Sequence, residues 1–109
     1  MEPPANDQTL ARQTARVATR IGANLRRLRL KARDEENRTQ RGLAGAVGCE
    51  VNYIQKTEYG TAVPSLRFLV RLAMALEVDV AEFFKRTAVA RSKVKGRPPL
   101  KKPKSSRRG

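Results

Sequence analysis

The sequence predicts an all-α fold, a compact bundle of five short helices in a single domain. Apolar residues recur three and four positions apart from Val17 to Leu76, which is the period of a helix with one buried face. No stretch alternates apolar and polar residues over the length of a strand. The 109 residues, 39% of them hydrophobic, are enough for one modest core.

The first helix is expected from about Leu10 to Arg33, before the polar run at residues 34–38. The second is expected at residues 40–47, with Thr39 as its N-cap, because a threonine hydroxyl accepts a bond from the first turn. Gly48 then ends this helix, since glycine adopts the left-handed conformation at low cost. The expected inward positions are Val17, Ile21, Leu25, Leu28, Leu43, Ala44 and Val47.

The third helix is expected at residues 51–59 and is closed by Gly60. The fourth begins after Ser65, which serves as its N-cap. The fifth begins at Asp79, which has the spacing of a capping box with Glu82. The positions expected in the core are Leu66, Leu69, Leu72, Ala73, Leu76, Phe83 and Phe84.

Charge divides the chain into three parts. Lysine and arginine number 24 against 10 acidic residues, a net charge of +14, and residues 88–109 hold nine bases and no acid. We expect a flexible N-terminus at residues 1–9, a folded domain at residues 10–87 and a disordered polybasic tail at residues 88–109, because the tail has little apolar surface to bury. This excess of positive charge favours a protein that binds a polyanion.

The composition argues against an enzyme, a metal centre or a bound cofactor. The chain has no histidine, the commonest general base and metal ligand. Cys49 is the single cysteine, so neither an intrachain disulfide nor a zinc site made of cysteines can form. No apolar run approaches the roughly 18 residues of a membrane span, and the N-terminus lacks a secretory pattern. We therefore expect a cytoplasmic protein without a membrane partner.

Residues 39–60, TQRGLAGAVGCEVNYIQKTEYG, resemble the helix-turn-helix of the Cro and phage-repressor type, the XRE-like family. Further similar positions extend the resemblance over about residues 21–84. It implies a lambda-repressor-like DNA-binding domain, in which the helix at 40–47 crosses the DNA backbone and the helix at 51–59 enters the major groove. It therefore implies a DNA-binding transcriptional regulator that is cytoplasmic and associated with the nucleoid.

The resemblance also implies the residues of the DNA contact. Base edges are assigned to Val51, Asn52, Gln55 and Lys56, with Gln55 at the margin. Backbone contacts are assigned to Gln40, Arg41, Tyr53 and Tyr59, and packing inside the domain is an equal alternative for the two tyrosines. Asparagine can pair with adenine and lysine can donate to guanine. Arg29 and Glu58 occupy the places of a structural ion pair that holds the third helix.

Among the departures from the family pattern, which include a longer link between the first two helices with Arg38 at a usually apolar position, three concern the third and fourth helices. Thr57 replaces the usual leucine or isoleucine and weakens the core contact of the third helix. Glu77 replaces a glycine at the end of the fourth helix, so that C-cap must differ or be strained. Glu50 stands at the N-cap of the third helix, either as a partner of the helix dipole or as an acceptor for a cytosine amino group.

The tail contains Lys95-Gly96-Arg97-Pro98-Pro99, which looks like an AT-hook. In that motif a Gly-Arg-Pro core lies in the narrow minor groove of A·T-rich DNA, where the negative potential attracts arginine. The implied tail contacts are Lys95, Arg97, Lys101 and Lys102. The alternative is a generic polybasic tail that binds any polyanion, RNA included.

Two other functions stay open on the sequence alone. One is a non-specific nucleoid- or RNA-associated basic protein, and the other is an antitoxin-like or adaptor interaction module. For a homodimer the candidate interface is the segment from Leu10 to Arg20. Its Arg12, Arg16 and Arg20 are equally suited to form a stripe that faces phosphate.

Overall fold

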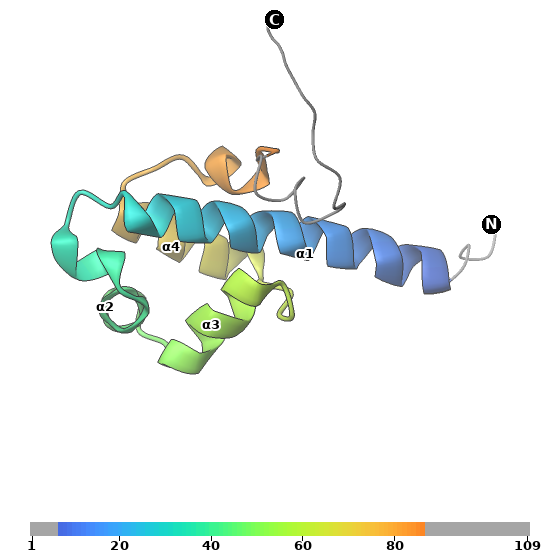
Figure 1. Cartoon of the computed structure of the whole chain (residues 1–109), viewed down its shortest axis with the longest axis horizontal. Helices are drawn as coiled ribbons and strands as arrows, with labels where there is room; N and C mark the ends of the chain where they lie inside the picture. The colour runs from blue at the N-terminus through green and yellow to red at the C-terminus, as the bar shows by residue number, and fades with distance from the viewer. Residues whose placement is uncertain (1–6, 87–109) are drawn as a thin grey trace, which may run out of the picture.

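The computed structural model describes residues 7–86 of the chain, which contain four α-helices and two short 3-10 helices joined by turns (Figure 1). They are α1 (Asp7–Leu30), η1 (Glu35–Arg38), α2 (Gln40–Val47), α3 (Val51–Tyr59), α4 (Leu66–Leu76) and η2 (Val80–Phe84). Residues 7–86 contain no strand, which confirms the all-helical prediction. The prediction of five helices is wrong. After Asp79 the chain forms the tighter turn η2, in which Glu82 N–H bonds three residues back.

α1 begins at Asp7 and ends at Leu30, three residues earlier at each end than expected. An acidic residue in the first turn complements the helix dipole and favours this early start. After Leu30 the next two N–H groups bond to carbonyls three residues back, and this tightening ends the helix. The polar run at residues 34–38 contains η1, which Asp34 caps by accepting a bond from Glu36 N at 3.0 Å.

The ends of α2, α3 and α4 follow the residues that the sequence indicates. Thr39 and Ser65 each accept a hydrogen bond from the N–H three residues later, at 2.9 and 3.0 Å. Gly48 and Gly60 adopt the left-handed conformation. Glu77 ends α4 at a φ of 60° and is the one residue other than glycine with positive φ in residues 7–86, so this C-cap is strained.

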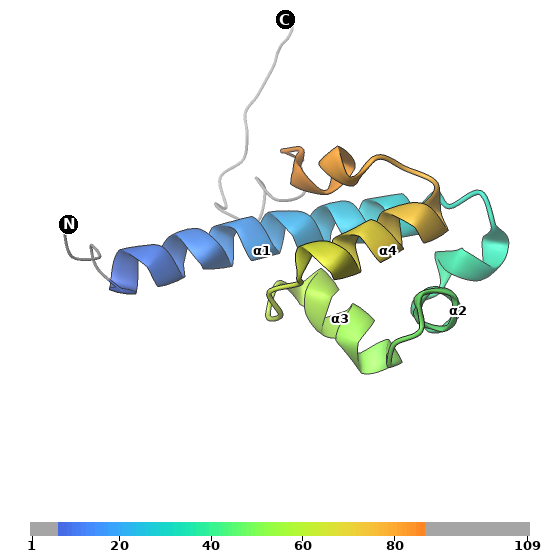
Figure 2. The same ribbon diagram turned by 180° about the vertical axis from the view of Figure 1, so that it is seen from behind.

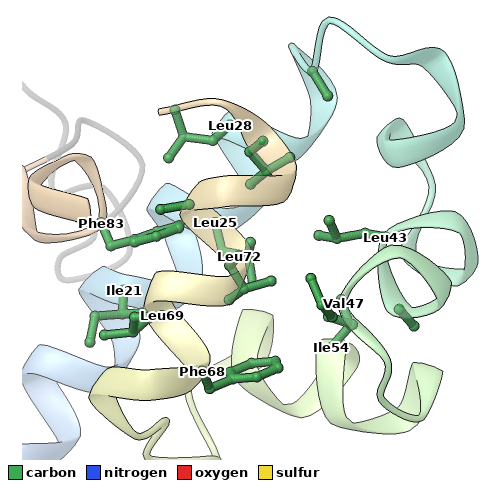
Figure 3. Packing of buried hydrophobic residues seen from close by; sticks show 14 residues of the cluster. Ile21, Leu25, Leu28, Leu43, Val47, Ile54, Phe68, Leu69, Leu72 and Phe83 are labelled. Carbon is green, nitrogen blue, oxygen red and sulfur yellow. The ribbon is translucent and has the colours of Figure 1, made fainter. Parts of the chain in front are cut away.

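Side chains from all four α-helices and from η2 form the core (Figure 3). The fully buried apolar residues are Leu25, Leu43, Ile54, Leu72 and Phe83. At this size each contributes about 1.5–3 kcal/mol by leaving water. The core therefore joins α2 and α3 to α1 and α4, and this fixes the position of the helix-turn-helix segment.

Three positions expected in the core are exposed instead: Leu66, Val17 and Phe84, at 68%, 37% and 41% of their full surface. Phe68 takes the place of Leu66, because residues 68, 72 and 76 share one stripe of α4 at the helical period. Val17 lies where α1 leaves the bundle. Phe84 points outward because the preceding residue of the tight turn η2 occupies the inward position.

α1 is the central element, and its first half extends past the other helices (Figures 1 and 2). α4 lies behind α1 in Figure 1 and in front of it in Figure 2, while α3 packs along a different side. η2 is tied to a third side of α1 by Asn24, whose buried Nδ2 donates to the carbonyls of Phe83 at 2.9 Å and Lys85 at 2.6 Å. α3, α4 and η2 thus contact three different sides of α1, so only the residues on one of these sides lie near α3.

Candidate nucleic-acid interface

A tight turn joins α2 to α3. The N–H groups of Gly48 and Cys49 both donate to the carbonyl of Ala44, at 2.9 and 3.0 Å. Ala44 is buried, and its small side chain allows the two helices to approach closely. Val47 and Ile54 bury their side chains on the inside of the turn. α2 and α3 are thereby packed as one unit with the outer side of α3 facing solvent.

Cys49 and Glu50 give this turn two ionisable side chains. Burial and the neighbouring Glu50 carboxylate raise the pKa of the Cys49 thiol, against a smaller opposite effect of Arg71. The thiol therefore stays protonated near neutral pH and is a poor nucleophile. Glu50 is the N-cap of α3, makes no side-chain capping bond and is exposed, and its charge lies at the positive end of the helix dipole.

The backbone of α3 lies directly against α1 at Gly22. A methyl group at this glycine would clash with the carbonyl oxygens of Thr57 and Glu58. Thr57 is fully buried, and its hydroxyl donates to the carbonyl of Tyr53 at 2.8 Å, so the polar group is satisfied within the helix. α3 therefore has little freedom to move relative to α1.

A buried polar network links α3 to α1 and α2. Arg29 Nε lies 2.6 Å from Glu58 Oε2, and Arg29 Nη2 donates to Oε1 at 3.1 Å. The remaining Nη1 of Arg29 donates to the backbone carbonyl of Arg38. Gln40 Nε2 donates to Glu58 Oε1 at 3.0 Å, and Gln55 Nε2 donates to Gln40 Oε1 at 3.3 Å. Four side chains from three helices thus hold α3 at a fixed rotation about its axis.

The outer side of α3 presents Asn52, Lys56 and Tyr59, all of them exposed. Tyr59 shows 78% of its surface, more than any other large apolar residue of the described chain. Arg41 is exposed at the start of α2. These four predicted contact residues are free to meet a ligand that approaches α3 from outside.

The other predicted contact residues are partly engaged within the domain. Val51 packs against the core, and Tyr53 lies with its ring 4.6 Å from that of Phe68 at an angle of 55°. Gln40 and Gln55 belong to the polar network of Glu58. No spacing in the sequence reveals this pairing, because the two glutamines meet only when α2 and α3 cross. The predicted tail residues Lys95, Arg97, Lys101 and Lys102 lie outside the described residues.

Arg26 adds a cation near α3 that the sequence analysis did not select. It is exposed and lies one turn after Gly22, on the side of α1 that contacts α3. The signal available in the sequence was its spacing of four residues from a glycine within a helix. Residues 7–86 hold 15 basic and nine acidic side chains, so this part of the chain carries an excess of positive charge, and Arg29 compensates the charge of Glu58.

Arg16 and Arg20 in the first half of α1 do not join the surface around α3. Arg20 lies four and seven residues before Asn24 and Arg27, both of which face η2. Arg16 lies one turn before Arg20 on the same side. The helical period therefore directs both side chains away from α3.

Within residues 7–86, no group of three or more acidic, cysteine or histidine side chains is placed to hold a metal ion. No helix in the same range is both long and apolar enough to span a membrane.

Comparison with known protein families gives one match. The profile of a family described as a helix-turn-helix domain matches residues 20–83, which is more than half of the chain. No curated protein and no solved structure matches the chain significantly. The matched range contains the second half of α1 and all of α2, the turn, α3 and α4. The chain therefore belongs to the helix-turn-helix domain family.

Proposed function

We propose that the protein is a DNA-binding transcriptional regulator of the Cro and phage-repressor type, which inserts α3 into the major groove. The observation that carries the proposal is the two-sided character of α3. One side is fixed by Gly22 and the Glu58 network, and the other presents Asn52 and Lys56 to solvent. A helix held in this way can present base-reading side chains without reordering on binding, which lowers the entropic cost of association.

The chemistry of the exposed residues suits base recognition. Asn52 can bond to both N6 and N7 of adenine, and Lys56 can donate to O6 or N7 of guanine. Arg41 and Tyr59 flank them and are suited to phosphate oxygens. Gln40 uses one of its two Nε2 hydrogens on Glu58, which leaves the other for a phosphate at the N-terminus of α2. Val51 and Gln55 contribute at the margin of the contact.

The basic tail adds affinity in this proposal. Lys95, Arg97, Lys101 and Lys102 neutralise phosphates, and Arg97 enters a narrow minor groove in the manner of an AT-hook. Each neutralised phosphate of duplex DNA adds about 0.9 to the slope of log affinity against log salt. Replacing all four residues by glutamine in the full chain should therefore reduce the slope by about 3 to 4. An unchanged slope would remove these residues from the contact, and an equal reduction of the slope on RNA and on A·T-rich duplex DNA would indicate a generic polyanion tail.

The decisive experiment is selection from a randomised DNA duplex pool at about 150 mM salt, near physiological ionic strength. The full chain is compared with the double variant Asn52→Ala, Lys56→Ala. The matched control is Gln13→Ala, Lys31→Ala, which removes one amide and one lysine from exposed positions outside α3. All three proteins are first checked for equal helix content by circular dichroism.

The proposal expects one enriched motif for the parent and the control, and loss of that motif in the α3 variant. Each lost base contact should weaken the free energy of binding to the enriched motif by about 1–3 kcal/mol. Enrichment of no motif, or the same motif in all three proteins, would contradict reading by α3. The first of these results would favour a non-specific nucleoid- or RNA-associated protein. Absence of nucleic-acid binding would instead favour an adaptor module.

A further inference from the structure

A pocket of about 310 Å³ opens on the surface between α1, the loop before α4 and the end of η2. Its walls include Val17 and Ile21 of α1, Val63 of the loop, Leu69 of α4 and Phe84 of η2. None of the described residues that line it is charged. Val17, Val63 and Phe84 are exposed, so the pocket presents apolar surface to solvent.

The pocket is the centre of an exposed apolar face that is separate from the outer side of α3. Leu10 lies one turn before the pocket residue Thr14 on α1, and Leu66 lies one turn before Leu69 on α4. Single exposed hydrophobic residues are ordinary, but a gathering around a pocket marks an interaction site. The exposed apolar face consists of Leu10, Val17, Val63, Leu66 and Phe84.

The described part of the chain ends at the rim of this pocket. Phe84 is both a wall of the pocket and the last residue of η2, and Arg86 follows two positions later. Asn24 fixes this end by donating to the carbonyls of Phe83 and Lys85. A further 23 residues come after Arg86 in the sequence. The first of them therefore start beside the pocket.

The residues that follow Arg86 have the composition that the pocket favours. Thr87 is followed by the apolar run Ala88, Val89 and Ala90, whereas residues 91–109 hold all nine bases of the tail. Small and branched aliphatic side chains suit an apolar pocket. Val89 comes five residues after Phe84, and an extended chain spans about 3.3–3.6 Å per residue. This reach of roughly 16–18 Å exceeds the width of a pocket of this volume.

We propose that residues 87–90 dock in this pocket of their own chain, with the side chain of Val89 against Val17 and Val63. Closing a loop of about five residues costs less entropy than closing a longer one. A short link also gives the attached segment an effective concentration in the millimolar range, on the order of 1 mM or more. Another protein or a second copy of the chain must compete with a segment that is always present at that concentration.

Docking carries the chain from one side of α1 to another. In Figure 2 the end of η2 lies above α1 and the loop before α4 lies below it, and the pocket contacts both. Val63 of this loop is four residues after Tyr59, the last residue of α3. Residues 91–109 then leave the domain near the end of α3 instead of beside η2. This consequence rests on the proposed function, in which α3 and the basic tail contact the same DNA.

Docking also shortens the free linker before the basic contacts of the tail. Arg97 is 11 positions after Arg86 but only seven after Ala90. The local concentration of a linked group falls roughly as the −3/2 power of linker length. A docked segment therefore raises the local concentration of Arg97 near the bound DNA about twofold.

Methyl NMR of the full chain tests the docking without DNA, so its outcome does not depend on the proposed regulatory function. We expect nuclear Overhauser contacts between the methyl groups of Val89 and those of Val17 or Val63. Val89→Gln should shift the signals of both wall residues, because a polar side chain does not enter an apolar pocket without cost. Val94→Gln is the matched control, since it makes the same substitution in the tail outside the docked segment.

Three results would overturn the docking. The first is the absence of the Overhauser contacts. The second is an equal response of the wall signals to Val89→Gln and Val94→Gln, which would leave the pocket to another protein. The third is a contact that arises between differently labelled copies, because a second chain would then supply the segment. Both substitutions lie outside the hydrophobic core, and circular dichroism checks that helix content is unchanged.

DNA binding tests the consequence of docking for the tail. The duplex carries the motif enriched by the full chain, followed by an A·T tract, and fluorescence anisotropy measures affinity. Val89→Gln should bind about twofold more weakly than the parent, whereas Val94→Gln should bind equally. Equal affinities of the two variants, with the Overhauser contacts present, would contradict the placement of the tail by the pocket. Failure of the parent to bind DNA would contradict the proposed function alone, since the Overhauser contacts would persist.

Discussion

The ion pair between Arg29 and Glu58 provides the sharpest test of how α3 is held. The side chains are only 7% and 3% exposed, and Arg29 makes two contacts to the carboxylate and one to the carbonyl of Arg38. Replacing Arg29 by methionine leaves a buried carboxylate with the single hydrogen bond from Gln40. Breaking one side of a buried pair costs about 3–5 kcal/mol, because the remaining charge is no longer compensated.

Urea unfolding at 25 °C, followed by helix circular dichroism, measures this cost under a two-state analysis. Arg29→Met should lower the free energy of unfolding by about 3–5 kcal/mol. For a domain of this size each kcal/mol lowers the melting temperature by about 4–8 °C. Arg33→Met is the control, because its pair with Glu77 is 75% and 56% exposed and contributes about 0–1 kcal/mol.

The double variant Arg29→Met, Glu58→Met completes the cycle. The double variant leaves neither charge unpaired. Its loss of unfolding free energy should therefore be smaller, by up to about 3 kcal/mol, than the summed losses of the single variants Arg29→Met and Glu58→Met. Strictly additive costs would refute the coupling of the two side chains. So would a single Arg29 variant as stable as the Arg33 control, since a buried carboxylate would then need no partner.

Three further predictions concern the free energy of unfolding, measured by the same urea method. Gly22→Ala should destabilise the domain by at least about 2 kcal/mol, because the added methyl group meets the backbone of α3. Gly45→Ala is the control and should stabilise the domain by about 0.5–1 kcal/mol, because open space surrounds this helical glycine. Equal effects of the two substitutions would contradict the close contact at Gly22. In the Arg33→Met background, where the pair with Glu77 is already absent, Glu77→Gly should stabilise by up to about 1 kcal/mol by relieving the positive φ, and a loss of stability there would show that the cap is unstrained. The hydrogen bond from Lys85 lowers the pKa of Glu82, so its contribution is present above the unfolded pKa and is lost as the pH falls through the folded one. The variant Glu82→Gln should therefore lose less stability on acidification than the parent, and identical pH profiles would exclude this role.

The sequence by itself determines where the helices begin and end, because helix ends depend on interactions between residues that are close together in the chain. Thr39 and Ser65 cap helices because a hydroxyl at that position reaches an unpaired N–H, and Gly48 and Gly60 end helices because they tolerate positive φ. These effects depend on residues three or four positions apart. They located α2, α3 and the start of α4 at the boundaries that the structure shows, whereas the unusual cap at Glu77 was predicted from the family resemblance.

Contacts between distant segments decided the rest. Phe68 rather than Leu66 is buried because α4 is rotated so that the stripe of residues 68, 72 and 76 faces inward, with the ring of Phe68 against Tyr53 of α3. Gln40, Gln55 and Glu58 meet only because α2 and α3 cross against α1, so their pairing depends on the angle between helices and not on spacing. The exposed apolar face has the same origin. Helical periodicity gives α1 one continuous apolar stripe, and only the tertiary packing determines that its first half is left uncovered.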